Sequence, residues 1–301
     1  MKTNDMKMKS DMKMKSMTHE EKCAIRDGLL VYVRRFPSQN KAAMSLDGTS
    51  AGTVSSILNG RWDNVSDDMF RSIAAQICSM QTGWQIVETG AFQEISFALS
   101  DAQESKNVTW VVGEAGCGKT STARAYTEEH REVFYVLCSE DMKKGDFVRE
   151  IARRVGIKTD GSNIRELWGL ILDDVVQMQQ PLLIFDEADK LTEPVFHYFI
   201  SLYNKLEDKA GVVFLSTDYI CKRFRRGLHY QKPGYKELFS RIGRKFFELE
   251  PTTANDVHAI CRANGVTEQK MIDKIVAEAA GYDYDLRRVK KTIHREKRKE
   301  A

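Results

Sequence analysis

A glycine-rich segment directly after an apolar run constrains the fold of this chain more than any other feature. Residues 113–120 read Gly-Glu-Ala-Gly-Cys-Gly-Lys-Thr, and residues 108–112 before them read Val-Thr-Trp-Val-Val. The pattern G-x-x-x-x-G-K-T is typical of a tight loop between a buried strand and a helix, where backbone N–H groups and the helix N-terminus surround a phosphate. The sequence therefore predicts a strand, a phosphate-binding loop and a helix, and with them a nucleoside triphosphate as ligand.

Two carboxylates end a second apolar run. Asp186 and Glu187 follow residues 182–185, which read Leu-Leu-Ile-Phe. We expect Lys119 to neutralise the β and γ phosphate oxygens, and we expect Thr120 and Asp186 to hold Mg²⁺. Glu187 is placed to polarise the attacking water, which predicts hydrolysis of ATP to ADP and phosphate with ATP and Mg²⁺ as cofactors. A chance glycine loop beside an unrelated acidic pair is the alternative, and the order of the motifs argues against it. The predicted nucleotide-binding residues are Gly113, Glu114, Ala115, Gly116, Cys117, Gly118, Lys119, Thr120, Ser121 and Asp186.

The length and composition set the number of domains and the compartment. A chain of 301 residues is expected to form about two domains. No apolar stretch approaches the ~20 residues that cross a bilayer, and the N-terminus is rich in Lys and Met without the apolar run of a signal peptide. The six cysteines are scattered without a C-x-x-C pair and are expected to be reduced thiols. We therefore expect a cytoplasmic protein that has no membrane partner.

Positive charge is concentrated in three segments, although the net charge is only +3. Residues 1–17 hold five Lys against two Asp, residues 222–245 hold nine Lys and Arg against one Glu, and residues 287–301 hold eight against two Glu. Such segments favour polyanions because each neutralised phosphate releases counterions. A solvated surface is the alternative explanation for any single segment.

The N-terminal part predicts helices after a low-complexity arm. Residues 1–17 nearly repeat a Met-Lys-Met-Lys-Ser unit, which indicates a disordered basic arm. Thr18 with Glu21 is typical of a helix-starting cap, and helices are expected to about residue 36 and over 39–46, 51–58 and 66–79. The turn at residues 47–50 resembles that of the lambda-repressor-like helix-turn-helix family, over roughly residues 18–80. That resemblance implies DNA contacts from the helix 51–58 and beyond, at Thr53, Ser55, Ser56 and Arg61. A small helical packing or oligomerisation domain is the alternative.

Strands and helices alternate from residue 108 to residue 216, which predicts a parallel sheet covered on both faces. A helix with apolar spacing at Phe92, Ile95 and Leu99 is expected before the first strand. With its two motifs, the chain resembles the AAA+ superfamily of ATPases over about residues 85–295. The predicted fold is thus an α/β parallel-sheet core over 81–250 and a small helical lid with a basic tail over 251–301. An arm at 1–17 and an all-α helix-turn-helix domain at 18–80 precede them.

The resemblance to AAA+ proteins also implies roles for polar residues outside the two motifs. Residues 216–218 read Ser-Thr-Asp where the family carries its sensor 1 residue, usually Asn, and Thr217 is the expected substitute. The segment 237–246 resembles the one that supplies an arginine finger to the neighbouring subunit, with Arg241 as first candidate and Arg244 as reserve. The segment 283–289 resembles sensor 2, which would bring Arg287 to the phosphates. Residues 186–189 spell D-E-A-D, the signature of an RNA helicase family, but the chain has room for one ATPase core only. Asp189 and Lys190 are therefore interpreted as capping and surface residues.

The order of domains resembles the MuB-like and TnsC-like regulators of transposition. The resemblance implies an ATPase that binds duplex DNA with little sequence preference, forms homo-oligomeric filaments or rings, and delivers target DNA to a transposase that stimulates slow hydrolysis. DNA contacts from the ATPase core are expected at Lys222, Arg223, Arg225 and Arg226. A replication initiator or helicase loader and an ATP-regulated transcription switch are the alternatives.

Overall fold

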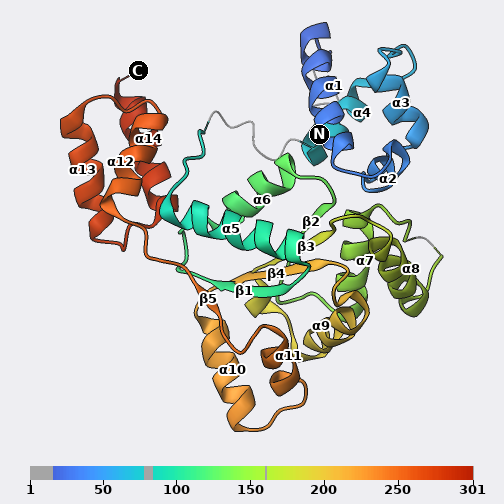
Figure 1. Cartoon of the computed structure of the whole chain (residues 1–301). Helices are drawn as coiled ribbons and strands as arrows, with labels where there is room; N and C mark the ends of the chain where they lie inside the picture. The colour runs from blue at the N-terminus through green and yellow to red at the C-terminus, as the bar shows by residue number, and fades with distance from the viewer. Residues whose placement is uncertain (1–15, 78–83, 160, 301) are drawn as a thin grey trace, which may run out of the picture.

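The computed structural model describes residues 16–77, 84–159 and 161–300. The predicted basic arm at 1–17 thus lies outside the described residues except for its last two positions. A five-stranded parallel sheet forms the centre of the molecule, as predicted, with the strand order β2-β3-β4-β1-β5 (Figure 1). The strands are β1 Val108–Val112, β2 Val133–Leu137, β3 Leu182–Asp186, β4 Gly211–Ser216 and β5 Phe247–Glu248.

The parallel arrangement brings the carboxyl ends of the central strands to one edge of the sheet. Val112 at the end of β1 is in register with Ser216 of β4 and with Glu248 of β5. Asp186 at the end of β3 is in register with Leu215 of β4. The glycine loop, the acidic pair and the sensor 1 segment therefore emerge side by side, which is where ligands bind in open α/β sheets.

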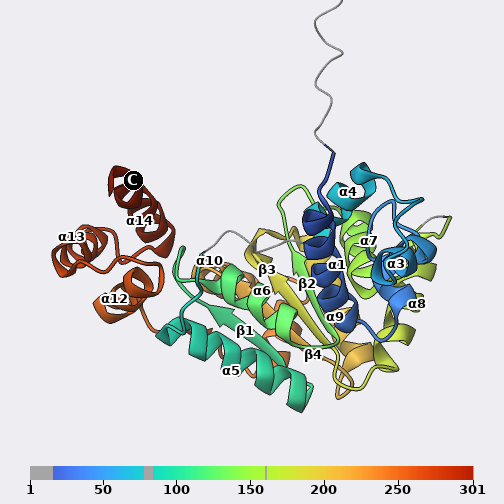
Figure 2. The same cartoon turned by 90° about the horizontal axis from the view of Figure 1, so that it is seen from above.

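Helices cover both faces of the sheet because alternate strand residues point to opposite sides. Leu182 and Ile184 of β3 join the apolar cluster under α5 and α6, whereas Leu183 and Phe185 join the cluster on the other face. Trp110, which is fully buried, stacks on Phe214 there at 4.4 Å between ring centroids. Figure 2 shows α5 and α6 together on one face. The covering elements are α5 Gly90–Ser105, α6 Lys119–Glu129, α7 Lys144–Val155, α8 Ile164–Val176, the short 3₁₀ helix η1 Ala188–Lys190, α9 Glu193–Leu206, α10 Tyr219–His229 and α11 Tyr235–Arg241.

The last three helices form a cluster of their own at one end of the sheet (Figures 1 and 2). They are α12 Ala254–Ala263, α13 Gln269–Ala280 and α14 Leu286–Glu300. Trp84 and Val87, which precede α5, pack into this cluster. The side chain of Asn264 accepts a hydrogen bond from Gln85 N at 2.9 Å and donates one to Gln85 O at 3.1 Å. Residues 84–87 therefore run along the C-terminal helices, although the sequence indicated only a connection here.

The N-terminal helices begin at the predicted residues because their caps are local. The side chains of Thr18, Ser38 and Ser50 each accept a hydrogen bond from a backbone N–H three residues on. Leu29, Ile57 and Phe70 are among the buried residues of a separate small core. The helices are α1 His19–Arg34, α2 Gln39–Met44, α3 Ala51–Leu58 and α4 Asp67–Ile77.

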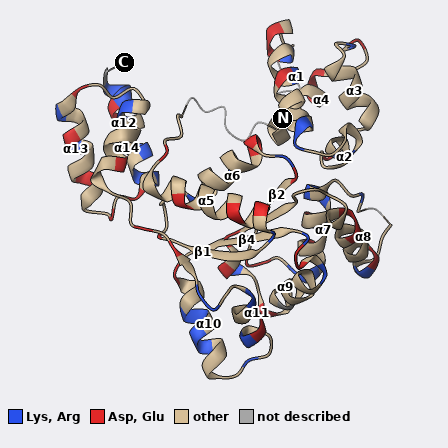
Figure 3. Ribbon diagram, viewed as in Figure 1, with Lys and Arg blue, Asp and Glu red and all other residues tan. Residues whose placement is uncertain are grey.

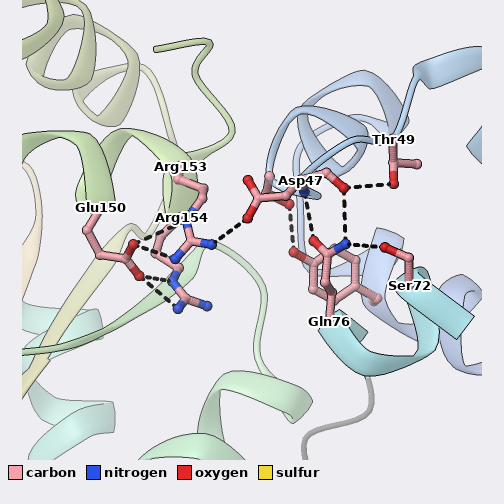
Figure 4. A network of polar contacts seen from close by, with 9 residues as sticks. Asp47, Thr49, Ser72, Gln76, Glu150, Arg153 and Arg154 are labelled. Atoms are coloured by element: carbon pink, nitrogen blue, oxygen red, sulfur yellow. Dashed lines mark hydrogen bonds and ion pairs between the residues drawn. The ribbon is translucent and has the colours of Figure 1, made fainter. Parts of the chain in front are cut away.

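The N-terminal helices are docked on the sheet near β2, α7 and α8, which nothing in the sequence predicted. Phe36 joins the apolar cluster under the sheet, with its ring centroid 6.4 Å from that of Phe134. Asp47 accepts a hydrogen bond from Arg153 at 2.9 Å, and Arg153 also contacts Glu150 (Figure 4). Gly156, with φ 84°, lies so close to α2 that a Cβ atom there would be 2.4 Å from the Lys41 carbonyl oxygen. In the described ranges no helix is both long and apolar enough to cross a membrane.

Candidate nucleotide site

The glycine loop between β1 and α6 adopts a conformation that only glycine tolerates at several positions. Gly116 and Gly118 have φ values of 85° and 106°, in the left-handed region. A Cβ atom on Gly116 would lie 2.3 Å from Asp285 Oδ1, and one on Gly113 would lie 2.7 Å from Leu249 Cδ1. Leu286 N also donates a hydrogen bond to Gly116 O at 3.1 Å. The loop is therefore held between β5 and the start of α14, and its shape fits the phosphate cradle that the motif predicts.

Lys119 begins α6 and turns its side chain back onto the loop. Its ammonium group donates hydrogen bonds to the carbonyl oxygens of Gly113 at 2.7 Å and Glu114 at 2.8 Å. These contacts keep a positive charge at the loop, next to the N-terminus of a helix that also favours anions.

Thr120 and Asp186, the two expected metal ligands, are in direct contact. Thr120 Oγ1 donates a hydrogen bond to Asp186 Oδ2 at 2.7 Å, and Tyr135 Oη donates to the same oxygen at 2.7 Å. Burial, then the neighbouring Asp186 carboxylate, raises the pKa of Tyr135, so the phenol remains a donor. Hydroxyl and carboxylate oxygens suit Mg²⁺. No group of three His, Cys, Asp or Glu able to hold a metal occurs among the described residues.

Glu187, the expected catalytic carboxylate, has an unusual backbone conformation and an ionic partner. Its φ of 55° lies in the left-handed region, which is strained for a residue with a side chain. Lys190 Nζ lies 2.5 Å from Glu187 Oε2. The hydrogen bond to Glu187 raises the pKa of Lys190. Lys190, interpreted from the sequence as a surface residue, is partly exposed but holds the Glu187 side chain.

The side chains of Thr217 and Ser216, at the end of β4, contact different parts of the molecule. Thr217 Oγ1 donates to Asp189 Oδ2 at 2.8 Å, so the expected sensor residue is connected to the segment that follows Glu187. Asp189, interpreted from the sequence as a capping and surface residue, is instead half-buried at this contact. Ser216 is buried and accepts a hydrogen bond from Trp110 Nε1 at 2.8 Å.

Replacing Ser216 with alanine is expected to lower the free energy of unfolding by about 1–3 kcal/mol, because the buried Trp110 N–H would lose its acceptor. Urea denaturation of the variant measures this loss. The matched control is Ser201→Ala on the exposed side of α9, which should change stability by less than about 0.5 kcal/mol. Equal stability of the two variants would contradict the structural role of Ser216.

A cavity of about 270 Å³ joins the loop to residues from distant parts of the chain. Arg287, the candidate sensor 2 residue, lines it, and so does Lys290 one turn further along α14. Nothing in the sequence indicated that residues 84–87 line this cavity, because a short apolar stretch before a helix does not reveal which element it packs against. The cavity lining includes Trp84, Gln85, Ile86, Val87, Lys119, Thr120, Asp186, Glu187, Asp189, Thr217, Ile260 and Leu286.

The candidate arginine fingers do not line this cavity in their own chain. Arg241, on α11, pairs with Glu237 at 2.6 Å and lies over the ring of Tyr203 at 4.2 Å. Its side chain is only 18% exposed. Arg244 follows Gly243 and is exposed. Of the two, Arg244 thus has the more accessible side chain.

The candidate DNA contacts fall on two separate surfaces. On α10, Lys222, Arg225 and Arg226 are exposed, whereas the guanidinium of Arg223 turns inward. Figure 3 shows the basic residues of α10 and α14 at separate places on the molecule. On α3, the side chains of Thr53, Ser55 and Ser56 are partly exposed, and Arg61 beyond the helix is exposed.

The chain is similar to several known proteins. The family model described as AAA domain matches residues 102–224, and the model described as Mu B transposition protein, C terminal, matches residues 240–296. The proteins called ATP-dependent target DNA activator B of Escherichia phages D108 and Mu are each 23% identical over 283 residues, which cover 90% of this chain and 89% of theirs. The solved ORC1 protein of Aeropyrum pernix in complex with DNA is 17% identical with a TM-score of 0.49. That alignment covers 66% of this chain and little more than half, 56%, of the solved chain.

The two family models together span the glycine loop, the acidic pair, α10, α11 and the C-terminal helices. The two phage proteins align over 90% of the chain. Together these matches support a MuB-like AAA+ ATPase.

Proposed function

We propose that this protein is an ATP-dependent DNA-binding ATPase that assembles on duplex DNA with little sequence preference and presents target DNA to a transposase. The proposal depends most on one observation: the glycine loop, the contact between Thr120 and Asp186, and Glu187 come together at one edge of the sheet. The similarity to the phage target DNA activators supports the transposition role.

Each residue of the site would have a separate role at the nucleotide. The loop N–H groups and Lys119 bind phosphate oxygens, while Thr120 and Asp186 hold Mg²⁺. When bound, Mg²⁺ supplies positive charge beside the phosphates. Glu187 orients and deprotonates water once its carboxylate is released from Lys190, since a carboxylate held by a lysine is a poorer base.

Assembly would complete the site with an arginine from a neighbouring copy. Arg241 is the proposed finger, with Arg244 as the reserve. To reach a neighbour, Arg241 must leave Glu237 and Tyr203, whereas the exposed Arg244 needs no such release. Because a guanidinium stabilises charge on the γ phosphate in the transition state, hydrolysis would depend on oligomerisation. Hydrolysis would then loosen the assembly.

We propose that DNA binds to α10 and to the N-terminal helices. Lys222, Arg225 and Arg226 contact phosphates from α10. In the N-terminal helices, α2 and α3 form the proposed helix-turn-helix. Because α3 carries no charged residue, it adds short polar contacts from Thr53, Ser55 and Ser56, and Arg61 adds charge.

Electron microscopy of the full chain with duplex of random sequence tests the proposal, with ATP compared against ADP. We expect helical filaments or rings on DNA with ATP alone. Discrete particles at particular sequences would instead favour a replication initiator or a transcription switch. No DNA binding with either nucleotide would contradict all three.

Trp84 offers a direct test of the nucleotide cavity. Its indole lines the cavity, with Lys290 Nζ 5.1 Å from the ring centroid. We expect ATP to change the tryptophan emission of the wild-type protein, because a bound base alters the polarity around this amphipathic ring. The change should disappear in Trp84→Phe and persist in Trp62→Phe, which removes an indole on the N-terminal helices. An undiminished change in Trp84→Phe would place the base elsewhere.

A further inference from the structure

Arg223 differs from Lys222, Arg225 and Arg226 of α10 because its side chain binds other parts of the chain. Its Nη1 donates hydrogen bonds to the carbonyl oxygens of Asp189 at 3.2 Å and Leu191 at 2.6 Å. Its guanidinium lies 4.3 Å from the ring centroid of Phe196 on α9. Arg223 therefore fastens α10 to the backbone of the segment that directly follows Glu187.

The same guanidinium also contacts Tyr235 at the start of α11. Its Nε donates to Tyr235 Oη at 3.0 Å, and Tyr235 Oη donates to Glu193 Oε1 at 3.2 Å. Glu193 also pairs with Lys232 at 2.7 Å. A planar guanidinium with donors in fixed directions loses little freedom in such a set of contacts, so this connection is rigid.

The segment from residue 187 to residue 191 faces the nucleotide cavity on its other side. Glu187 and Asp189 line that cavity, and Asp189 accepts the hydrogen bond from Thr217. Arg223 holds the carbonyl groups of this segment rather than its side chains. A shift of α10 would thus move the backbone that positions Glu187 and the partner of Thr217.

A second cavity, of about 680 Å³, lies between this segment and α10. Arg226 and Lys232 line it together with Asp189. Basic side chains on or near α10 and an acidic side chain of the segment 187–191 therefore border the same cavity. Arg223 and Arg226 line the same cavity.

We propose that Arg223 is a positioning residue that couples DNA binding on α10 to ATP hydrolysis at Glu187. The inference rests on the proposed function, because it assumes that DNA binds α10. Arg223 itself does not contact DNA: it transmits the position of α10 to the segment 187–191.

The test compares Arg223→Gln with Arg226→Gln, two changes that remove the same charge from one helix. ATP turnover and DNA binding are measured for the full chain over a range of concentrations of a random-sequence duplex. For Arg223→Gln we expect on the order of tenfold less turnover at saturating DNA, because the reacting groups are misplaced, with DNA affinity within about twofold of wild type. For Arg226→Gln we expect weaker DNA binding, a salt slope smaller by about 1, and normal turnover once DNA is saturating.

Tyr235→Phe is a second variant. It removes the acceptor of Arg223 Nε and the hydrogen bond to Glu193, but it leaves the contacts of Arg223 with the carbonyl oxygens of Asp189 and Leu191, so it should reduce the stimulation by DNA to a smaller extent. Thermal unfolding checks that each variant is folded. Full stimulation of a folded Arg223→Gln protein, or of Tyr235→Phe where Arg223→Gln does not fold, would overturn the inference and leave the proposed function intact. A wild-type protein whose hydrolysis does not respond to DNA would overturn both.

Discussion

Lys119→Ala is expected to weaken ATP binding by at least about 100-fold, because a charge-assisted hydrogen bond contributes about 1.5–3 kcal/mol and Lys119 would make more than one to phosphate. DNA binding that depends on ATP should be lost with it. The structure supports a local effect, since the hydrogen bonds of the ammonium group to residues that the structure describes all go to the loop, at the carbonyl oxygens of Gly113 and Glu114 and at Cys117 Sγ. Removing it should therefore leave the fold unchanged.

Equilibrium titration with a fluorescent ATP analogue measures the first effect, and fluorescence anisotropy of a labelled duplex measures the second. Lys209→Ala, at an exposed position before β4, is the matched control and should behave like wild type. DNA binding by Lys119→Ala that still responds to ATP would contradict the assignment of the glycine loop as the nucleotide site.

Glu187→Gln is expected to prolong DNA binding, whereas Lys119→Ala should abolish it. A glutamine keeps the size of the side chain but lacks the basic oxygen, and a positioned general base contributes roughly 10²- to 10⁴-fold to such a reaction. We expect hydrolysis to fall by about 100-fold or more while ATP still binds. The variant should then remain on DNA, since hydrolysis is the step that releases it.

Phosphate release measures the hydrolysis rate, and the dissociation of labelled DNA after a chase with unlabelled duplex measures the lifetime of the complex. Loss of the ion pair with Lys190 should have little effect on stability, because the lysine side chain is 43% exposed. Glu129→Gln, at the exposed end of α6 and outside the loop, is the control for loss of one carboxylate. A Glu187→Gln protein that hydrolyses ATP at the wild-type rate would assign the base to another residue.

Local sequence signals determined the parts of the molecule that depend on neighbouring residues. The phosphate loop, the strand ends at Val112 and Asp186, and the caps at Thr18, Ser38 and Ser50 each depend on a few consecutive residues. Helix periodicity also places the N-terminal helices within two residues of their observed ends. The parallel sheet followed from their alternation.

Contacts between distant parts of the chain were decided only by the tertiary structure. The strand β5 has two residues and forms because β1 offers a free edge, so no periodic pattern could indicate it. Residues 84–87 line the nucleotide cavity because Asn264 and the C-terminal helices hold them.

The sequence also could not predict the directions of charged side chains. Arg223 and Arg226 are both basic residues of α10, yet one is tied to the carbonyl oxygen of Leu191 and the other is exposed. Asp189 was likewise expected from the sequence to be a surface residue, whereas in the structure it accepts a hydrogen bond from Thr217. Residue type and spacing determined which chemical groups the protein has, whereas the packing of α10 and β4 around the segment 187–191 decided which of them meet, because such contacts join residues far apart in the chain.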